Sequence, residues 1–365
     1  MSRLHVSVTA GILFAFLLIA SPVMAGEWVP AGSDQPGFRI VDIAVSGDGA
    51  YSALTGNGGI ILLTADGTEC WRSPEGGYRS VCLSENASIL AAGGDGLCVL
   101  DKNGTVCATV RSRNYLNDVT ITADGSLIVA VADDETLRLY TPSGDLIRST
   151  ETGDDLVSVA ISPDGTYIAG GTVTGNVVLF SDAGEERWSY GLSRQPVTAV
   201  ALADGARTIA AVSADGAFAL LSRAGALLWS GSAPHAGGVA VTADGATAAL
   251  ADRQGIRFME RDGTPAGQIT GLDGSVAAAM DSNGRMVAMT DGTRISGFVP
   301  KVTAVAEETP LPEQSPGEAQ PDITTGQTQP HEGEGPVPTS SPFPLLPAGV
   351  ALILSLGCAG RGLRC

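Results

Sequence analysis

The chain repeats one motif seven times between Ile40 and Lys301. The motif is a tight turn between two apolar runs, and successive turns are 38, 38, 40, 40, 40 and 39 residues apart. A fixed period near 40 residues with strand-like halves is typical of a β-propeller, in which each unit buries its faces against its neighbours. The sequence therefore predicts an all-β, seven-bladed β-propeller. Its seven turns are Asp48-Gly49, Asn86-Ala87, Asp124-Gly125, Asp164-Gly165, Asp204-Gly205, Asp244-Gly245 and Asn283-Gly284.

The fourth unit shows what one blade contains. Residues 156–162 alternate as a strand, residues 167–172 run back after the turn, and two further strand-like runs follow at 177–180 and 185–189. Turns that contain glycine separate these four runs. Four short antiparallel strands per blade are therefore expected.

Two columns of equivalent positions fit this alignment. Three of the four tryptophans share the position four residues after the later turn glycine, which places them on the outermost strand. Small residues occupy the position four residues before the Asp or Asn of the motif, as expected for an innermost strand where the blades converge. The outer column is Trp71, Ala108, Arg148, Trp188, Trp229 and Gly267, and the inner column is Ala44, Cys82, Thr120, Ala160, Val200, Ala240 and Ala279.

The seventh unit, residues 276–301, has no fourth strand of its own. The segment Glu27-Trp28-Val29 can supply it, so that the two ends of the repeat region join. An open ring would leave two unpaired surfaces of the kind that blades normally bury. We therefore expect the N-terminal strand to close the ring in the last blade.

Both ends of the chain have distinct compositions. Residues 1–25 have a basic start, a short apolar run and a Val-x-Ala site, which predicts a signal peptide cleaved after Ala25. Residues 26–301 form the expected propeller. Residues 302–344 contain no Lys or Arg and are rich in Pro, Thr and Glu, so they are expected to be a disordered stalk. Residues 345–365 hold a short apolar run followed by Arg361 and Arg364, which predicts a C-terminal anchor or sorting tail.

Several short motifs resemble known repeat families. The run Ser162-Pro-Asp-Gly165 with Ile168-Ala-Gly-Gly171 resembles WD40-type and related surface-layer propellers, although the Gly-His and Trp-Asp dipeptides of WD40 units are absent. The runs 62–71 and 220–229, each ending in Trp, resemble the quinone (PQQ)-type propeller repeat. The C-terminal tail resembles the sorting tails of archaeal cell-surface proteins. These resemblances imply an outward-facing protein that binds proteins, glycans or other ligands, with a minority of such propellers being enzymes.

Composition excludes some functions. The net charge is −18, and nucleic-acid binding requires clustered Lys and Arg, so it is not expected. His235 is the only histidine in the predicted fold, so a His-based triad or a multi-histidine metal site cannot be assembled there. No Cys-x-x-Cys pair is present, and no metal or other cofactor is predicted.

Two groups of residues are candidate ligand-binding sites. Arg111, Arg113 and Tyr115 cluster in a loop between blades, and Arg and Tyr dominate the energetics of interfaces. Ordinary loop polarity is the alternative. Asp42 and Asp118 share a column six residues before the turn, near the axial channel, and could hold a cation or polar ligand. The alternative is a ring of channel-facing polar groups bonded to water. That column also holds Ser80, Ser158 and Thr198, and further polar residues of the rim are Tyr78, Arg79, Asp154, Asp155, Arg194 and Asp273.

Cys98 and Cys107 flank Asp101-Lys-Asn-Gly104. A four-residue loop would place them directly opposite each other on a hairpin, which would allow a disulfide. A two-residue turn would shift the register and forbid it.

The predicted function is a non-enzymatic scaffold that binds an extracellular protein or glycan. It would be exported, tethered to the cell surface through the C-terminal tail, and monomeric. Two alternatives stay open: a carboxylate-based enzyme that acts on polysaccharide at the axial channel, and a structural component of the envelope.

Overall fold

The computed structural model describes residues 28–74, 76–270 and 277–300. The predicted signal peptide (1–25), stalk (302–344) and tail (345–365) lie outside the described residues. Among the described residues, no helix has the length and apolar character needed to cross a membrane.

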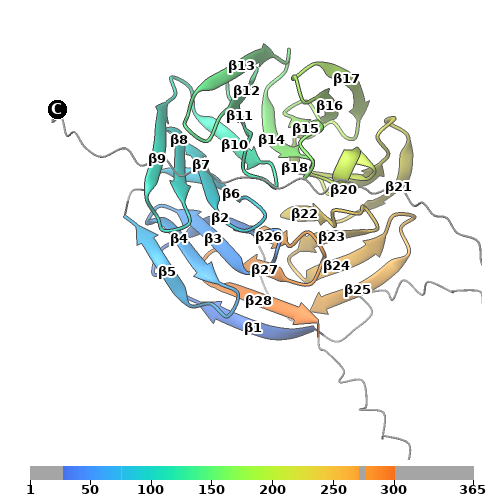
Figure 1. The fold of residues 1–365 in the computed structure, drawn as a ribbon. Helices are drawn as coiled ribbons and strands as arrows, with labels where there is room; N and C mark the ends of the chain where they lie inside the picture. The colour runs from blue at the N-terminus through green and yellow to red at the C-terminus, as the bar shows by residue number, and fades with distance from the viewer. Residues whose placement is uncertain (1–27, 75, 271–276, 301–365) are drawn as a thin grey trace, which may run out of the picture. The chain divides into compact units, whose positions relative to one another are not determined.

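The described chain forms seven four-stranded antiparallel sheets, numbered here as blades 1 to 7 (Figure 1). Blade 1 contains β2 (Ile40–Val45), β3 (Tyr51–Gly56), β4 (Gly59–Thr64) and β5 (Glu69–Ser73). Blade 2 contains β6 (Tyr78–Leu83), β7 (Ile89–Gly94), β8 (Gly96–Asp101) and β9 (Val106–Arg111). Blade 3 contains β10 (Leu116–Ile121), β11 (Ile128–Ala132), β12 (Thr136–Tyr140) and β13 (Leu146–Glu151). Blade 4 contains β14 (Leu156–Ile161), β15 (Tyr167–Thr172), β16 (Asn176–Ser181) and β17 (Glu186–Gly191).

The remaining blades follow the same order. Blade 5 contains β18 (Val197–Leu202), a short 3₁₀ turn η1 (Asp204–Ala206), β19 (Ile209–Ser213), β20 (Ala217–Leu221) and β21 (Leu227–Ser232). Blade 6 contains β22 (Gly238–Val241), β23 (Thr247–Asp252), β24 (Gly255–Glu260) and β25 (Pro265–Thr270). Blade 7 contains β26 (Ala277–Met280), β27 (Val287–Thr290), β28 (Ile295–Pro300) and β1 (Trp28–Asp34). The predicted seven-bladed fold is confirmed.

Ring closure by the N-terminal strand is also confirmed. β1 is antiparallel to β28, with Trp28 opposite Pro300 and Asp34 opposite Ile295. In Figure 1 the blue N-terminal strand lies beside the orange C-terminal one. The strand is longer than the three residues named from the sequence, and a register shift between Pro30 and Gly32 bends it.

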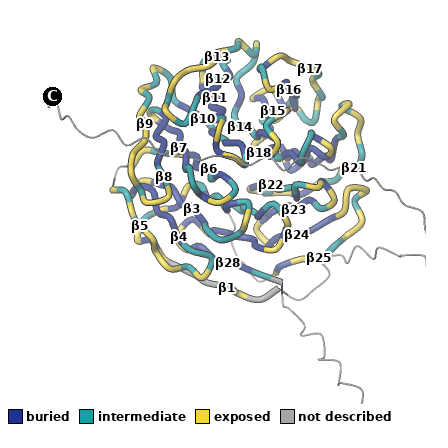
Figure 2. The backbone as a smooth tube through the Cα atoms, viewed as in Figure 1, coloured by how far each residue is buried: buried dark blue, intermediate teal, exposed yellow. Residues whose placement is uncertain are grey.

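The hydrophobic core lies between adjacent blades. One cluster combines Val131 and Leu137 of blade 3 with Leu156 and Phe180 of blade 4, all nearly inaccessible to solvent. The middle strands are therefore apolar on both faces, as the non-alternating sequence runs indicated. Figure 2 shows this gradient: the inner and middle strands are mostly buried, whereas outer strands such as β9 and β13 are largely exposed.

The inner column is correct in every blade except blade 5. Ala44 lies opposite Ala53 and Ala160 lies opposite Ala169, but the equivalent pair in blade 5 is Ala201 with Ala210. The prediction of Val200, and of Thr198 beside it, is therefore wrong by one residue. The reason is that Ala206, with φ of 51°, takes the left-handed turn position that Gly49 takes in blade 1.

A buried hydroxyl stabilises most of the repeated turns. In blade 1 the Ser46 hydroxyl donates to Asp48 Oδ1 at 2.6 Å and accepts the Tyr51 N–H at 3.0 Å. Each such group closes the hairpin and satisfies its buried polar atoms. This column was missed in the sequence, although Ser or Thr recurs two residues before the turn Asp or Asn. Its members are Ser46, Ser84, Thr122, Ser162 and Thr242, with Asp281 in blade 7.

The repeated turns are also joined to one another around the ring. The Glu85 amide donates to the Ala123 carbonyl at 2.8 Å, and the Ser282 amide donates to the Gly47 carbonyl at 3.0 Å. Pro163 has no N–H to continue this pattern into blade 5. There the Gly205 amide donates instead to Asp164 Oδ2 at 2.9 Å. These bonds hold the blades in a closed ring at one end of the axial channel.

Tryptophans of the outer column dock blade 1 onto blade 2 and blade 4 onto blade 5. Trp71 Nε1 donates to the Lys102 carbonyl at 2.9 Å, and Trp188 Nε1 donates to the Arg223 carbonyl at 2.8 Å. A Cβ atom at Gly104 would lie 2.9 Å from the Trp71 ring, so the turn glycine is required for this contact. The column predicted from the sequence is confirmed by the strand register, in which Trp71 is opposite Leu62 and Trp229 is opposite Leu220.

Candidate functional site

A cavity of about 160 Å³ opens on the rim that carries the blade-to-blade connections and the middle-hairpin loops. It lies at blade 2, between the chain that enters β6 and the loop that leaves β9. We call it the blade 2 cavity. Its lining residues are Gly76, Gly77, Tyr78, Asp95, Gly96, Leu97, Thr109, Val110 and Arg111.

Three of the residues that line the cavity are glycines, and two of them lie where strands approach closely. A Cβ atom at Gly94 would lie 2.2 Å from the Gly77 carbonyl oxygen, and one at Gly96 would lie 2.5 Å from the Val110 carbonyl oxygen. Glycine is therefore needed where the strands approach this closely. The two charged lining residues are Asp95 and Arg111, both exposed, and Tyr78 beside them is half-buried.

Tyr115 supports the cavity from the neighbouring loop. Its hydroxyl donates to the Gly77 carbonyl at 3.1 Å, and the Arg79 guanidinium lies 5.6 Å from its ring centroid, within cation–π range. Partial burial raises the pKa of the Tyr115 hydroxyl, while Arg79 lowers it and Asp95 raises it. Tyr115 is therefore within electrostatic range of both Arg79 and the cavity carboxylate.

The structure separates the three residues predicted for this loop. Arg111 lines the cavity, and Tyr115 contacts Gly77 in its wall. Arg113 is exposed and is not one of the lining residues. Asp95 was missed, although the Gly94-Asp95-Gly96 run, which makes an unusually short middle hairpin, is a signal that could have found it.

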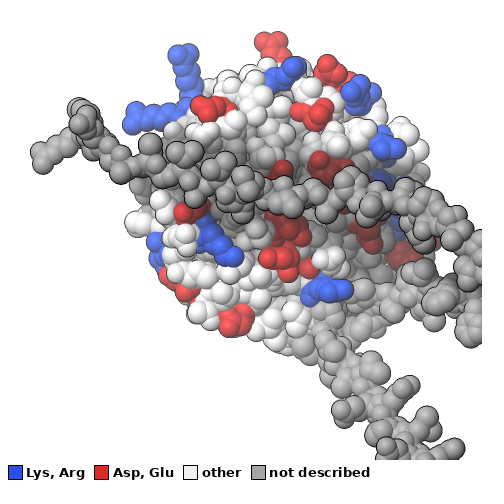
Figure 3. Space-filling model, in the orientation of Figure 1, with Lys and Arg blue, Asp and Glu red and all other residues white. Residues whose placement is uncertain are grey.

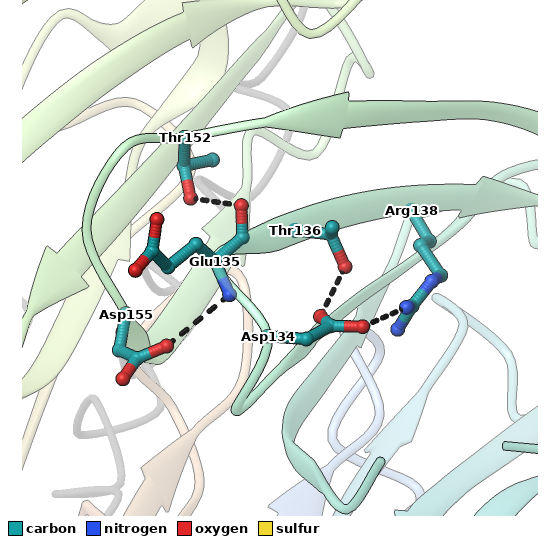
Figure 4. Close-up of polar contacts among 6 residues, drawn as sticks. All are labelled: Asp134, Glu135, Thr136, Arg138, Thr152 and Asp155. Carbon is teal, nitrogen blue, oxygen red and sulfur yellow. Dashed lines mark hydrogen bonds and ion pairs between the residues drawn. The ribbon is translucent and has the colours of Figure 1, made fainter. Parts of the chain in front are cut away.

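A carboxylate-rich strip, formed by Asp134, Glu135 and Asp155, lies on the turn between β11 and β12 and on the connection from β13 to β14 (Figure 4). Asp134 accepts hydrogen bonds from Thr136 and Arg138, and the Glu135 amide donates to Asp155 Oδ1 at 3.2 Å. The Thr152 hydroxyl donates to the Glu135 carbonyl at 2.8 Å. Glu135 has φ of 55°, a conformation that costs energy for a non-glycine residue. The strip is held by contacts within itself.

Asp42 and Asp118 lie on the innermost strands and connect blades. Asp42 Oδ2 accepts the Val81 amide of blade 2 at 2.9 Å. Asp118 Oδ2 accepts the Val159 amide of blade 4 at 2.7 Å, and its Oδ1 accepts the Ser80 hydroxyl of blade 2 at 2.5 Å. Each carboxylate therefore spans a junction between blades.

Burial raises the pKa of both carboxyl groups. Loss of hydration, with a smaller effect of the Asp118 charge, raises the pKa of Asp42 to about 7. Loss of hydration raises the pKa of Asp118 to about 6, against the opposing effect of its hydrogen bonds from Ser80, Val159 and Val119. Both carboxyl groups therefore keep a proton to a higher pH than exposed aspartates do.

The register of blade 2 does not fit the predicted disulfide. Cys98 lies opposite Thr109, and Cys107 falls at the irregularity where the register shifts between Val99 and Leu100. Cys98 is buried whereas Cys107 is exposed. The expectation that the two face each other directly is therefore wrong, because the residue opposite Cys98 is Thr109, two residues beyond Cys107 in β9, and the β-bulge accounts for one of those two positions.

Two further observations concern ligands. His235 is exposed in the connection between blades 5 and 6, with φ of 64°. Within the described ranges, no group of three or more His, Cys, Asp or Glu side chains is placed to hold a metal ion. On the described part of the face seen in Figure 3, Lys and Arg side chains are scattered among Asp and Glu.

Comparison with known proteins does not indicate a function. No protein-family model matches the chain, and no curated protein matches it.

Proposed function

We propose that this protein is a non-enzymatic scaffold of the cell surface that binds an extracellular protein or glycan through the blade 2 cavity. The main support for this proposal is the cavity itself, which is lined by Arg111, Asp95 and Tyr78 together with three glycines. A concave site with few polar groups is where a ligand gains most contact. Export and a C-terminal tether are part of the proposal, and they are supported by the sequence of residues 1–25 and 345–365.

The contacts of the Asp42 and Asp118 carboxylates favour a binding protein over an enzyme that hydrolyses polysaccharide. A pair of carboxyl groups with raised pKa values is what general acid–base catalysis requires. However, both oxygens of Asp42 accept backbone amides, from Ile43 and Val81, and both oxygens of Asp118 accept hydrogen bonds as well. A structural role accounts for every contact of these two side chains.

We expect the triple variant Arg111→Ala, Arg113→Ala, Tyr115→Phe to lose partner capture. The test compares envelope extract retained on the immobilised chain and on the variant, read by mass spectrometry. Removing one charged hydrogen-bond partner of a ligand costs about 1.5–3 kcal/mol, so retention should fall at least tenfold. Phenylalanine at position 115 keeps the ring that faces Arg79 and loses one hydrogen bond worth about 1 kcal/mol, so the thermal unfolding temperature should fall by no more than about 4 °C.

The control variant is Arg194→Ala with Arg253→Ala, two exposed rim arginines on the far blades. It should capture the same partners as the unaltered chain. Equal capture by the triple variant would remove this site from consideration, and self-association without any captured partner would favour the structural alternative.

A further inference from the structure

The charges that line the blade 2 cavity balance. Asp95 supplies a carboxylate, Arg111 supplies a guanidinium, and no other lining residue carries a charge. Asp95 would attract a cationic ligand, but Arg111 would repel it. Arg111 would attract an anionic ligand, but Asp95 would repel it. The cavity therefore selects against a strong net charge on the group that enters it, while offering both a strong acceptor and a strong donor.

The volume and the lining limit the shape of that group. A cavity of about 160 Å³ is roughly ten times the 10–15 Å³ that suffices for one water molecule, so it admits a group of several heavy atoms. Three of its lining residues are glycines without side chains, and the aromatic residue Tyr78 also lines it. A compact ring that carries several hydroxyl groups matches each of these features. Its hydroxyls can donate to Asp95 and accept from Arg111, and its C–H face can lie against apolar wall atoms.

We propose that the blade 2 cavity binds one neutral saccharide ring of a glycan, with Asp95 and Arg111 as the residues that determine specificity. This inference rests on the proposed function and names its ligand class. A peptide added along the outer edge of β9 would use the same Thr109 to Arg111 backbone, but its strand pairing would not involve Asp95, which lies in the turn between β7 and β8.

The test is saturation-transfer NMR on the full chain with methyl glycosides of glucose, galactose and mannose. Glucuronic acid and glucosamine serve as charged counterparts. At least one neutral glycoside is expected to bind, with both charged sugars at least tenfold weaker. Asp95→Ala and Arg111→Ala should each weaken binding at least tenfold, and Asp95→Asn should weaken it less because the amide keeps one acceptor.

Asp133→Ala is the matched control, because Asp133 is an exposed aspartate in the equivalent loop of blade 3 and lies outside the lining. It should leave glycoside binding unchanged. If only charged sugars or peptides bind, and Asp95→Ala abolishes that binding, the saccharide assignment is overturned while the binding site stands. If no glycoside binds but the triple variant still loses its partner, the saccharide assignment is likewise overturned and the binding site stands. If partner capture also survives in the triple variant, both proposals fail.

Discussion

Deletion of residues 28–34 is expected to lower the unfolding temperature of the propeller by more than 10 °C. These residues form β1, which supplies the outer strand of blade 7 and pairs with β28 along its whole length. Without β1, β28 becomes an unpaired edge strand. The strand hydrogen bonds that are lost contribute about 1 kcal/mol each. A domain of this size shifts by about 2–4 °C for each kcal/mol.

The measurement is thermal unfolding followed by circular dichroism. Deletion of seven residues from the region 310–320 serves as a control for chain length. Addition of a synthetic peptide of residues 26–36 should restore part of the lost stability, because the strand needs no covalent link to pair. An unchanged unfolding temperature in the deletion variant would mean that blade 7 is stable with three strands.

Stability is expected to fall as the pH rises from about 5 to 8. The folded pKa values of Asp42 and Asp118, about 7 and about 6, lie above the unfolded value of 3.8. The folded state therefore binds more protons than the unfolded state across this window, so deprotonation disfavours folding. Carboxyl groups with a lowered pKa, such as Asp124 and Asp164, change the stability with pH only below about pH 4. They therefore do not mask the loss of stability expected between pH 5 and 8. Between pH 5 and pH 8 the two deprotonations together lower the free energy of unfolding by on the order of 4 kcal/mol, about 8–16 °C in unfolding temperature.

The variant Asp42→Asn removes the group with the larger shift. Its unfolding temperature should depend less on pH between 5 and 8 than that of the unaltered chain. Asp124→Asn provides the comparison, since the pKa of Asp124 is lowered by its hydrogen bonds with Thr122 and Ser126 and its titration lies outside the window. A pH profile that rises toward pH 8, or one that Asp42→Asn leaves unaltered, would contradict the placement of these carboxyl groups.

Much of the fold could be predicted because each blade repeats the same physical problem. A closed ring of blades explains the period of the turns and the tryptophan column. It also explains why unit seven lacks an outer strand of its own. The error in blade 5 arose because Asp204-Gly205 looks like the other turns, while Ala206 takes the left-handed conformation. That choice depends on the pairing of β18 with β19, which residue identity alone does not determine.

The site was less predictable than the fold. Arg111 and Tyr115 could be named because Arg and Tyr are scarce in this acidic chain, and both lie at or beside the cavity. Asp95 lies 16 residues from Arg111 in the sequence, and only the pairing of β7, β8 and β9 brings both to one cavity. Asp42 and Asp118 were correctly placed on the innermost strands, but their bonds to Val81 and Val159 depend on how neighbouring blades pack.

The closed ring is tested most directly by cross-linking its two ends. Val29 of β1 lies opposite Val299 of β28, so Val29→Cys with Val299→Cys should form an intrachain disulfide under mild oxidation, identified by mass spectrometry of proteolytic fragments. The control pair is Val29→Cys with Thr270→Cys, since Thr270 is exposed on β25, the outer strand of blade 6. We expect the 29–299 cross-link to form and the 29–270 cross-link to be absent. A chain that joins positions 29 and 270 but leaves 29 and 299 apart would contradict the closed seven-bladed ring.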